Sequence, residues 1–142
     1  MKIIIGADHA GYEYKEKLKK FLKTNDTDVS DKGTHTPDSV DYPDCAHAVA
    51  KAIADKEGEF GILICGSANG VAITANKHHG IRAAICWTNE IAELARKHNN
   101  ANIICIPARF VDIGLAEEMV NAFIKTKFEE GRHERRVEKI EC

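Results

Sequence analysis

Residues 60–70 read FGILICGSANG, a short apolar run that ends in a turn made of small residues. A run of this length and composition is typical of a buried strand in a parallel sheet. The turn contains two glycines and no bulky side chain, so it can bend the chain sharply into a helix. This stretch predicts a strand–turn–helix unit, from which parallel α/β sheets are built.

The same alternation of short apolar runs with longer amphipathic stretches continues along the chain, without a low-complexity linker or an internal repeat. Strands are predicted over residues 2–7, 28–32, 60–65, 81–86 and 102–106. Helices are predicted over residues 11–24, 43–57, 69–78, 89–98 and 112–127, and a last helical segment over 131–140. The order of these elements predicts an α/β fold with a five-stranded parallel sheet and a C-terminal helical tail.

The composition favours a small cytoplasmic protein and argues against several classes of partner. A chain of 142 residues with 44% hydrophobic residues suits one domain over residues 1–142. A formal net charge of -2 gives no general attraction to nucleic acid or to an anionic membrane, and the apolar runs are too short to span a membrane. The five cysteines form no CxxC pair, and no secretory leader is visible, so free thiols in a reducing compartment are expected.

Ligands of open parallel sheets bind at the carboxyl ends of the strands, so those ends hold the first candidates. The first predicted strand runs into Asp8 and His9, just before a helix begins. An acid and an imidazole at this place suit a binding site. The alternative is that Asp8 caps the helix and His9 is incidental.

Cys65 ends the third predicted strand, directly before the small-residue turn of residues 66–70. Backbone N–H groups in such a turn can converge on one oxyanion, and the following helix terminus is expected to lower the cysteine pKa from about 8.5 toward neutrality. The alternative is that Cys65 is a small buried hydrophobe like Cys86 and Cys105, which also end predicted strands. Only Cys65 precedes a glycine-rich turn.

Other phosphate-binding loops do not fit these letters. A phosphatase loop of the Cys-x5-Arg kind and a Walker loop both fail at Val71, where the first needs arginine and the second lysine. A dinucleotide fingerprint needs glycine at three positions, of which only Gly66 is present. A thiol beside an anion-binding turn is what remains.

Basic side chains appear at three further places. His98 lies near the end of the fourth predicted helix, and Arg109 follows the fifth predicted strand. Arg132 and Arg136 are four residues apart, so they share one helical face. Such groups often only complement a helix dipole or form a solvated surface. The sharper interpretation is a planar clamp for phosphate.

Together these segments resemble the type B ribose-5-phosphate isomerase family, which also includes galactose-6-phosphate isomerase subunits. The resemblance covers nearly the whole chain and keeps the order of every motif. It rests on the segments Asp8-His9-Ala10-Gly11, Asp31-Lys32-Gly33-Thr34, Asp41-Tyr42-Pro43, Cys65-Gly66-Ser67, Ala75-Asn76-Lys77, Gly80-Ile81-Arg82-Ala83, His98-Asn99 and Gly131-Arg132-His133.

The resemblance implies a Rossmann-like three-layer sandwich and a homodimer or tetramer whose active sites take residues from two subunits. It makes Cys65 the base that takes the proton next to the carbonyl and His98 the acid that opens the furanose ring. The implied substrate contacts are Asp8, His9, Tyr42 and Asn99 for the sugar, the amides of Gly66, Ser67, Ala68, Asn69 and Gly70 for the enediolate, and Arg109, Arg132 and Arg136, with His9, for the phosphate.

One departure from the family pattern concerns the turn itself. The family often has threonine and glycine where this chain has Ser67 and Ala68. Ser67 keeps a hydroxyl that can move a proton between the two sugar oxygens. Ala68 is strained if its position requires a positive φ.

The chemistry of these residue types agrees with the resemblance. Abstraction of a proton next to a carbonyl needs a positioned base and donors for the developing oxyanion, and ring opening needs an acid that titrates near neutral pH. No metal or organic cofactor is expected. Alternatives are an isomerase of allose or galactose 6-phosphate, a non-catalytic sugar-phosphate or nucleotide-binding domain, and a thiol redox sensor.

Overall fold

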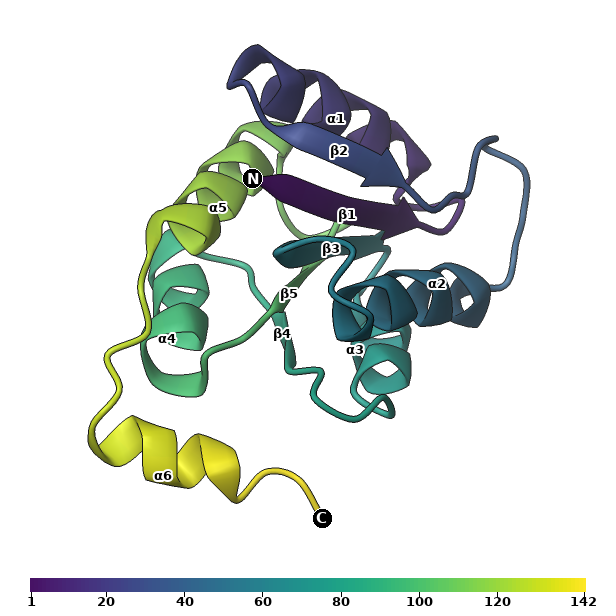
Figure 1. Cartoon of the computed structure of the whole chain (residues 1–142). Helices are drawn as coiled ribbons and strands as arrows, with labels where there is room; N and C mark the ends of the chain where they lie inside the picture. Colours follow the sequence, from purple (N-terminus) through teal and green to yellow (C-terminus); the bar gives the residue numbers. More distant parts are fainter.

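The computed structural model describes residues 1–142 as one parallel sheet with helices on both faces (Figure 1). The strand order is β2-β1-β3-β5-β4, and every neighbouring pair is parallel. The strands are β1 (Lys2–Ala7), β2 (Asp28–Asp31), β3 (Phe60–Cys65), β4 (Ala83–Ile85) and β5 (Ile103–Pro107). The helices are α1 (Tyr12–Thr24), α2 (Tyr42–Ala54), α3 (Asn69–Ala75), α4 (Asn89–Asn99), α5 (Ile113–Lys125) and α6 (Arg132–Glu138). The predicted fold class is confirmed.

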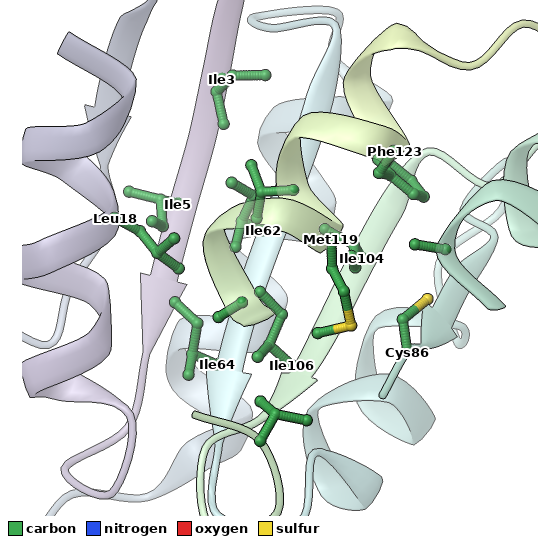
Figure 2. Packing of buried hydrophobic residues seen from close by; sticks show 14 of the residues in the cluster. Ile3, Ile5, Leu18, Ile62, Ile64, Cys86, Ile104, Ile106, Met119 and Phe123 are labelled. Carbon is green, nitrogen blue, oxygen red and sulfur yellow. The ribbon is translucent and has the colours of Figure 1, made fainter. Parts of the chain in front are cut away.

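Alternating side chains of the strands divide the core into two layers. Ile3 and Ile5 point to the face covered by α1, α4 and α5, whereas Ile4 points to the face covered by α2 and α3. Figure 2 shows the first layer, in which Met119 and Phe123 of α5 pack against isoleucines of three central strands. Because both faces are buried, the central strands β1, β3 and β5 are nearly continuous apolar runs, whereas the edge strand β2 reads Asp-Val-Ser-Asp.

Helix α6 stands apart from these layers. It packs against α4 and lies away from the sheet (Figure 1). Its exposed face carries charged side chains, and His133 is its only buried residue. None of the helices combines the length and the apolar character that a membrane crossing would need.

Helix α2 ends at Ala54 rather than at residue 57, and the boundaries of α3 and β4 also differ from the predicted ones. Helix α3 ends at Ala75 rather than at residue 78, because the N–H groups of Lys77 and His78 turn back to carbonyls three residues earlier. Strand β4 begins at Ala83 rather than at residue 81. The N–H of Arg82 donates to the side chain of Asn102, so it is not part of the ladder.

Candidate active site

Cys65 and Asp8 meet at the carboxyl ends of two neighbouring strands. The thiol of Cys65, the last residue of β3, donates to the Oδ2 atom of Asp8 at 3.0 Å. The Oδ1 atom of Asp8 accepts from the N–H of Gly11 at 3.0 Å, which holds the turn before α1. Asp8 does not cap α1, whose N-cap residue is Gly11; one of its oxygens holds the turn before that helix and the other contacts the thiol.

The sequence predicts a lowered pKa for Cys65, and this prediction is wrong. Burial of the thiol, together with the hydrogen bond to Asp8 and the charge of that carboxylate, raises the pKa of Cys65 to about 11. The backbone N–H groups of Gly66 and Ala68 act in the opposite direction but are outweighed. Helix α3 has only seven residues, so its terminus offers little to offset burial. In the single chain Cys65 rests as a protonated thiol.

The turn after β3 places Ala68 at a positive φ, which is the conformation in which an alanine is expected to be strained. Ala68 has φ of 65° and lies fully buried against the α2 and α3 side of the core. A left-handed alanine costs roughly 1–2 kcal/mol relative to an ordinary backbone conformation. Its methyl group packs into the protein and does not line the cavity beside Cys65. The departure from glycine therefore strains the turn without narrowing the cavity.

Two side chains press against the glycines of this turn. A Cβ atom on Gly70 would come within 2.5 Å of the Tyr42 ring, and one on Gly66 within 3.2 Å of the Arg109 guanidinium group. The absence of side chains at both positions lets Tyr42 and Arg109 approach the turn. Ser67 is exposed, and its hydroxyl accepts from the backbone N–H of Asn69 at 3.4 Å.

Cys65, Asp8, Arg109 and the start of this turn line a cavity of about 290 Å³ at the carboxyl ends of the strands. It brings together several of the predicted site residues and adds Phe110, which sequence reasoning missed and which is 75% exposed. The ring nitrogen Nδ1 of His9 accepts from the N–H of Val40, so the loop before α2 holds that imidazole. The lining residues are Asp8, His9, Ala10, Cys65, Gly66, Ser67, Arg109 and Phe110.

Three other predicted residues, His98, Asn99 and Arg136, line a separate cavity of about 340 Å³ between α4 and α6. His98 and Asn99 end α4, and Arg136 of α6 faces them across this cavity. Arg132 lies exposed on the same helix but does not line the cavity. His133, which was part of a matching motif but not a predicted site residue, completes the group.

His98 and His133 are stacked on one another beside a carboxylate. Their ring centroids are 4.1 Å apart with an angle of 8° between the planes. The Oε2 atom of Glu129 lies 3.8 Å from Nε2 of His98 and 3.6 Å from Nε2 of His133. Burial and the neighbouring His98 lower the pKa of His133. Glu129 was missed from the sequence, although its spacing of four residues from His133 was a usable signal.

The two cavities lie at opposite ends of the strands, the Cys65 cavity at the carboxyl ends and the α4–α6 cavity toward the amino ends. Residue 99 ends α4 just before β5 begins, and Ile103 of β5 pairs with Gly61 near the start of β3. Cys65 lies four residues further along β3, about 13 Å away at the usual rise of a strand. A single chain therefore does not bring His98 to Cys65.

The largest hollow of the chain, about 720 Å³, does not contain Cys65 either. It adjoins the α4–α6 cavity, with which it shares Asn99 and Ile140. Residues of the segment between α3 and β4 line it, and the side chain of Glu141 near the C-terminus accepts from the N–H of Gly80 in that segment. A choice of the active site by cavity volume alone would therefore have missed Cys65.

Comparison with known proteins places this geometry among sugar-phosphate isomerases. The family model described as Ribose/Galactose Isomerase matches residues 3–140. The ribose-5-phosphate isomerase B of Escherichia coli (strain K12) is 42% identical over 139 residues, covering 98% of this chain and 93% of that protein.

Solved structures agree with this similarity. The ribose 5-phosphate isomerase of Thermotoga maritima has a TM-score of 0.96 and 49% identity, covering 98% of this chain and 96% of that one. A ribose-5-phosphate isomerase B from Mycoplasma genitalium, solved with bound ribulose-5-phosphate, has a TM-score of 0.93 and 42% identity, covering 98% and 93% of the two chains.

Proposed function

The chain belongs to the ribose/galactose isomerase family, and from this premise we propose that it interconverts ribose 5-phosphate and ribulose 5-phosphate. The observation that carries the proposal is the cavity in which Cys65, the turn after β3 and Arg109 meet at the carboxyl edge of the sheet. A base, a set of backbone donors and a fixed cation are what proton transfer within a sugar phosphate requires.

Cys65 acts as the base on the carbon next to the carbonyl. Its high pKa leaves little thiolate at neutral pH, but the thiolate that forms is a correspondingly strong base. The N–H groups of residues 66–70 hold the oxygen on which charge develops, and the Ser67 hydroxyl moves a proton between the two sugar oxygens. Asp8, which already accepts from the thiol, keeps the sulfur directed into the cavity. Tyr42 and His9 contact the sugar.

His98 opens the furanose ring by donating a proton to the ring oxygen as the bond from that oxygen to the anomeric carbon breaks and the anomeric hydroxyl loses its proton to water. Asn99 beside it binds the sugar. The ring must open before the carbonyl exists, so this step precedes the work of Cys65. An imidazole suits it because its ordinary pKa lies near neutrality. Arg109 from one side and Arg132 and Arg136 from the other hold the phosphate, whose binding energy orients the reacting carbons.

The site is completed by a second copy of the chain. Because the two cavities lie at opposite ends of the strands, the cavity that holds His98 in one subunit must meet the cavity that holds Cys65 in its partner. Phe110 and Tyr42, 75% and 41% exposed, are the apolar groups beside the Cys65 cavity that such a contact would cover. We therefore propose a homodimer with two shared active sites as the minimal active unit. Residues 1–142 are its single domain.

The proposal includes a location and a preference among substrates. Five free cysteines suit the reducing cytoplasm. The buried methyl group of Ala68 leaves the cavity unchanged, so this residue does not argue for a six-carbon sugar. The buried thiols of Cys45 and Cys86 do not support a redox sensor, because burial raises the pKa of each to about 12.

The experiment is to supply the purified protein with ribose 5-phosphate and to follow the appearance of ribulose 5-phosphate. Allose 6-phosphate and galactose 6-phosphate are run in parallel as competing substrates. We expect the pentose to react with the highest kcat/KM. Binding of all three sugars without conversion would instead identify a non-catalytic domain, and faster conversion of a hexose would reject the proposed substrate.

A further inference from the structure

The cluster of His98, Glu129 and His133 has the composition of a transition-metal site. One ligand atom from each of the three residues lies within 4.8 Å of the other two. No other group of three such side chains in the chain is close enough to hold an ion. We propose that this cluster binds a divalent transition metal, Zn²⁺ being the best match, and that binding inhibits the enzyme.

The ligand set and its spacing support the proposal. Two imidazoles and one carboxylate form the three-ligand set used in open zinc sites. Bonds of 2.0–2.2 Å in a tetrahedral arrangement place ligand atoms about 3.3–3.5 Å apart. The Oε2 atom of Glu129 is 3.8 Å from His98 and 3.6 Å from His133, so each gap closes with a small side-chain movement.

The two rings must tilt for their lone pairs to converge, because they are nearly parallel in the stacked arrangement. His98 has 39% of its side chain exposed and Glu129 has 50%, so these two ligands have room to turn. His133 has only 10% exposed and provides the fixed point. The energy lost by unstacking two imidazoles is small beside that of two metal–nitrogen bonds.

The backbone holds the three ligands near one another without a metal. The N–H of Glu129 donates to the carbonyl of Lys97, next to His98, at 3.1 Å. The N–H of His133 donates to the carbonyl of Glu130 at 3.1 Å, so the turn that begins α6 holds His133 close to the residue that follows Glu129. The cluster borders the cavity of about 340 Å³ between α4 and α6, which leaves space for a water molecule as the fourth ligand.

Inhibition rests on the proposed function of His98. A metal occupies the ring nitrogen that faces Glu129 and fixes the imidazole there, so His98 can no longer turn to deliver a proton to the sugar. The ion is therefore an inhibitor and not a cofactor. Metal binding itself does not depend on that function, so the two claims are measured separately.

Binding is measured by titrating the protein with Zn²⁺ in a calorimeter and with Co²⁺ by visible absorption. The starting protein carries Cys142→Ser and His47→Asn, because an exposed thiol and the exposed His47–His78 pair are competing ligands. We expect one ion per chain and the absorption of tetrahedral Co²⁺. In Glu129→Gln and in His133→Asn the affinity should fall by roughly 10- to 100-fold or more. Glu134→Gln, on the exposed face of α6, is the matched control and should keep the affinity.

Inhibition is measured in the same proteins. The quantity measured is the Zn²⁺ concentration that halves the metal-free rate of each variant. That concentration should rise in Glu129→Gln in parallel with the loss of affinity. No binding, or binding that survives both ligand substitutions, would overturn the site. Binding at the site without inhibition would leave the site standing and would instead contradict the role of His98 in catalysis.

Discussion

The Cys65 half and the His98 half of the site are built in different ways. Cys65 and Asp8 are 9% and 5% exposed and belong to the ends of central strands. His98 has 39% of its side chain exposed, and Arg132 and Arg136 lie on a short helix whose main packing partner is α4. One half is part of the core, and the other is attached to its outside.

This difference separates the base of the proton transfer from the arginines that bind the phosphate. A base needs fixed geometry, which the sheet supplies through backbone and buried side chains. A phosphate clamp works through charge and tolerates small movements, so it can be placed on a peripheral helix and offered to a second subunit. Substitutions in the core half should therefore abolish turnover, whereas those in the outer half should mainly change affinity or one step.

The largest expected effect is that of Cys65→Ala. It should lower kcat by about 10²–10⁴-fold, the range attributed to a positioned proton-transfer group, while leaving sugar-phosphate affinity nearly unchanged. Steady-state assays and calorimetric titration with ribose 5-phosphate measure the two quantities. Near-normal turnover would remove Cys65 from the mechanism.

The control for this variant is Cys105→Ala, since Cys105 is also a buried strand thiol but faces no cavity. It should lower the melting temperature and leave kcat unchanged, because only packing is lost. A loss of activity equal to that of Cys65→Ala at unchanged stability would mean that the wrong thiol has been identified.

His98→Asn should have the next largest effect, and only in one direction. Initial rates from the cyclic aldose should fall by about 10²-fold, because ring opening loses its proton donor. Initial rates from the open-chain ketose should fall much less. Equal losses in the two directions would assign His98 to substrate positioning.

The arginines of α6 should control affinity. Arg132→Ala or Arg136→Ala should weaken binding of substrate and of inorganic phosphate by roughly 10- to 100-fold, the value of a lost charge-assisted hydrogen bond. Lysine at either position should restore only part of this, since it lacks the planar fork. Removing residues 131–142 should produce the same loss with the sheet still folded. Full phosphate affinity in the truncated protein would show that the arginines are only a solvated surface.

The smallest effect concerns the protonation of Cys65. The folded-state pKa is about 11 against an ordinary 9.0, so the folded thiol keeps its proton where the unfolded one loses it. Its contribution to stability is complete below pH 9 and is lost as pH rises toward 11. Asp8→Asn removes the neighbouring charge and should lower this pKa.

The pH dependence of iodoacetamide alkylation at Cys65, in a Cys142→Ser background, measures that pKa directly. The rise in the alkylation rate should move to lower pH in Asp8→Asn. An unchanged profile would show that burial alone sets the pKa of the thiol.

The sequence predicted the fold well because each element has its own local signal. The apolar runs and the turn after Cys65 identify strand, helix and cavity wall without reference to the rest of the chain. The pKa of Cys65 was predicted wrongly, since the local helix signal says nothing of burial or of the Asp8 carboxylate that arrives from another strand. The pairing of Glu129 with His98 was missed for the same reason, because it depends on how α6 folds back on α4.

The central claim is that neither half of the site works without a second chain. The direct test is to mix Cys65→Ala with His98→Asn, each of which retains about one hundredth or less of the native rate with ribose 5-phosphate, and to let the subunits exchange. Half of the randomly formed dimers would carry one native site of two, so about a quarter of the native rate should return. If the mixed dimers form and no activity returns, Cys65 and His98 do not act across subunits, and the shared site is contradicted.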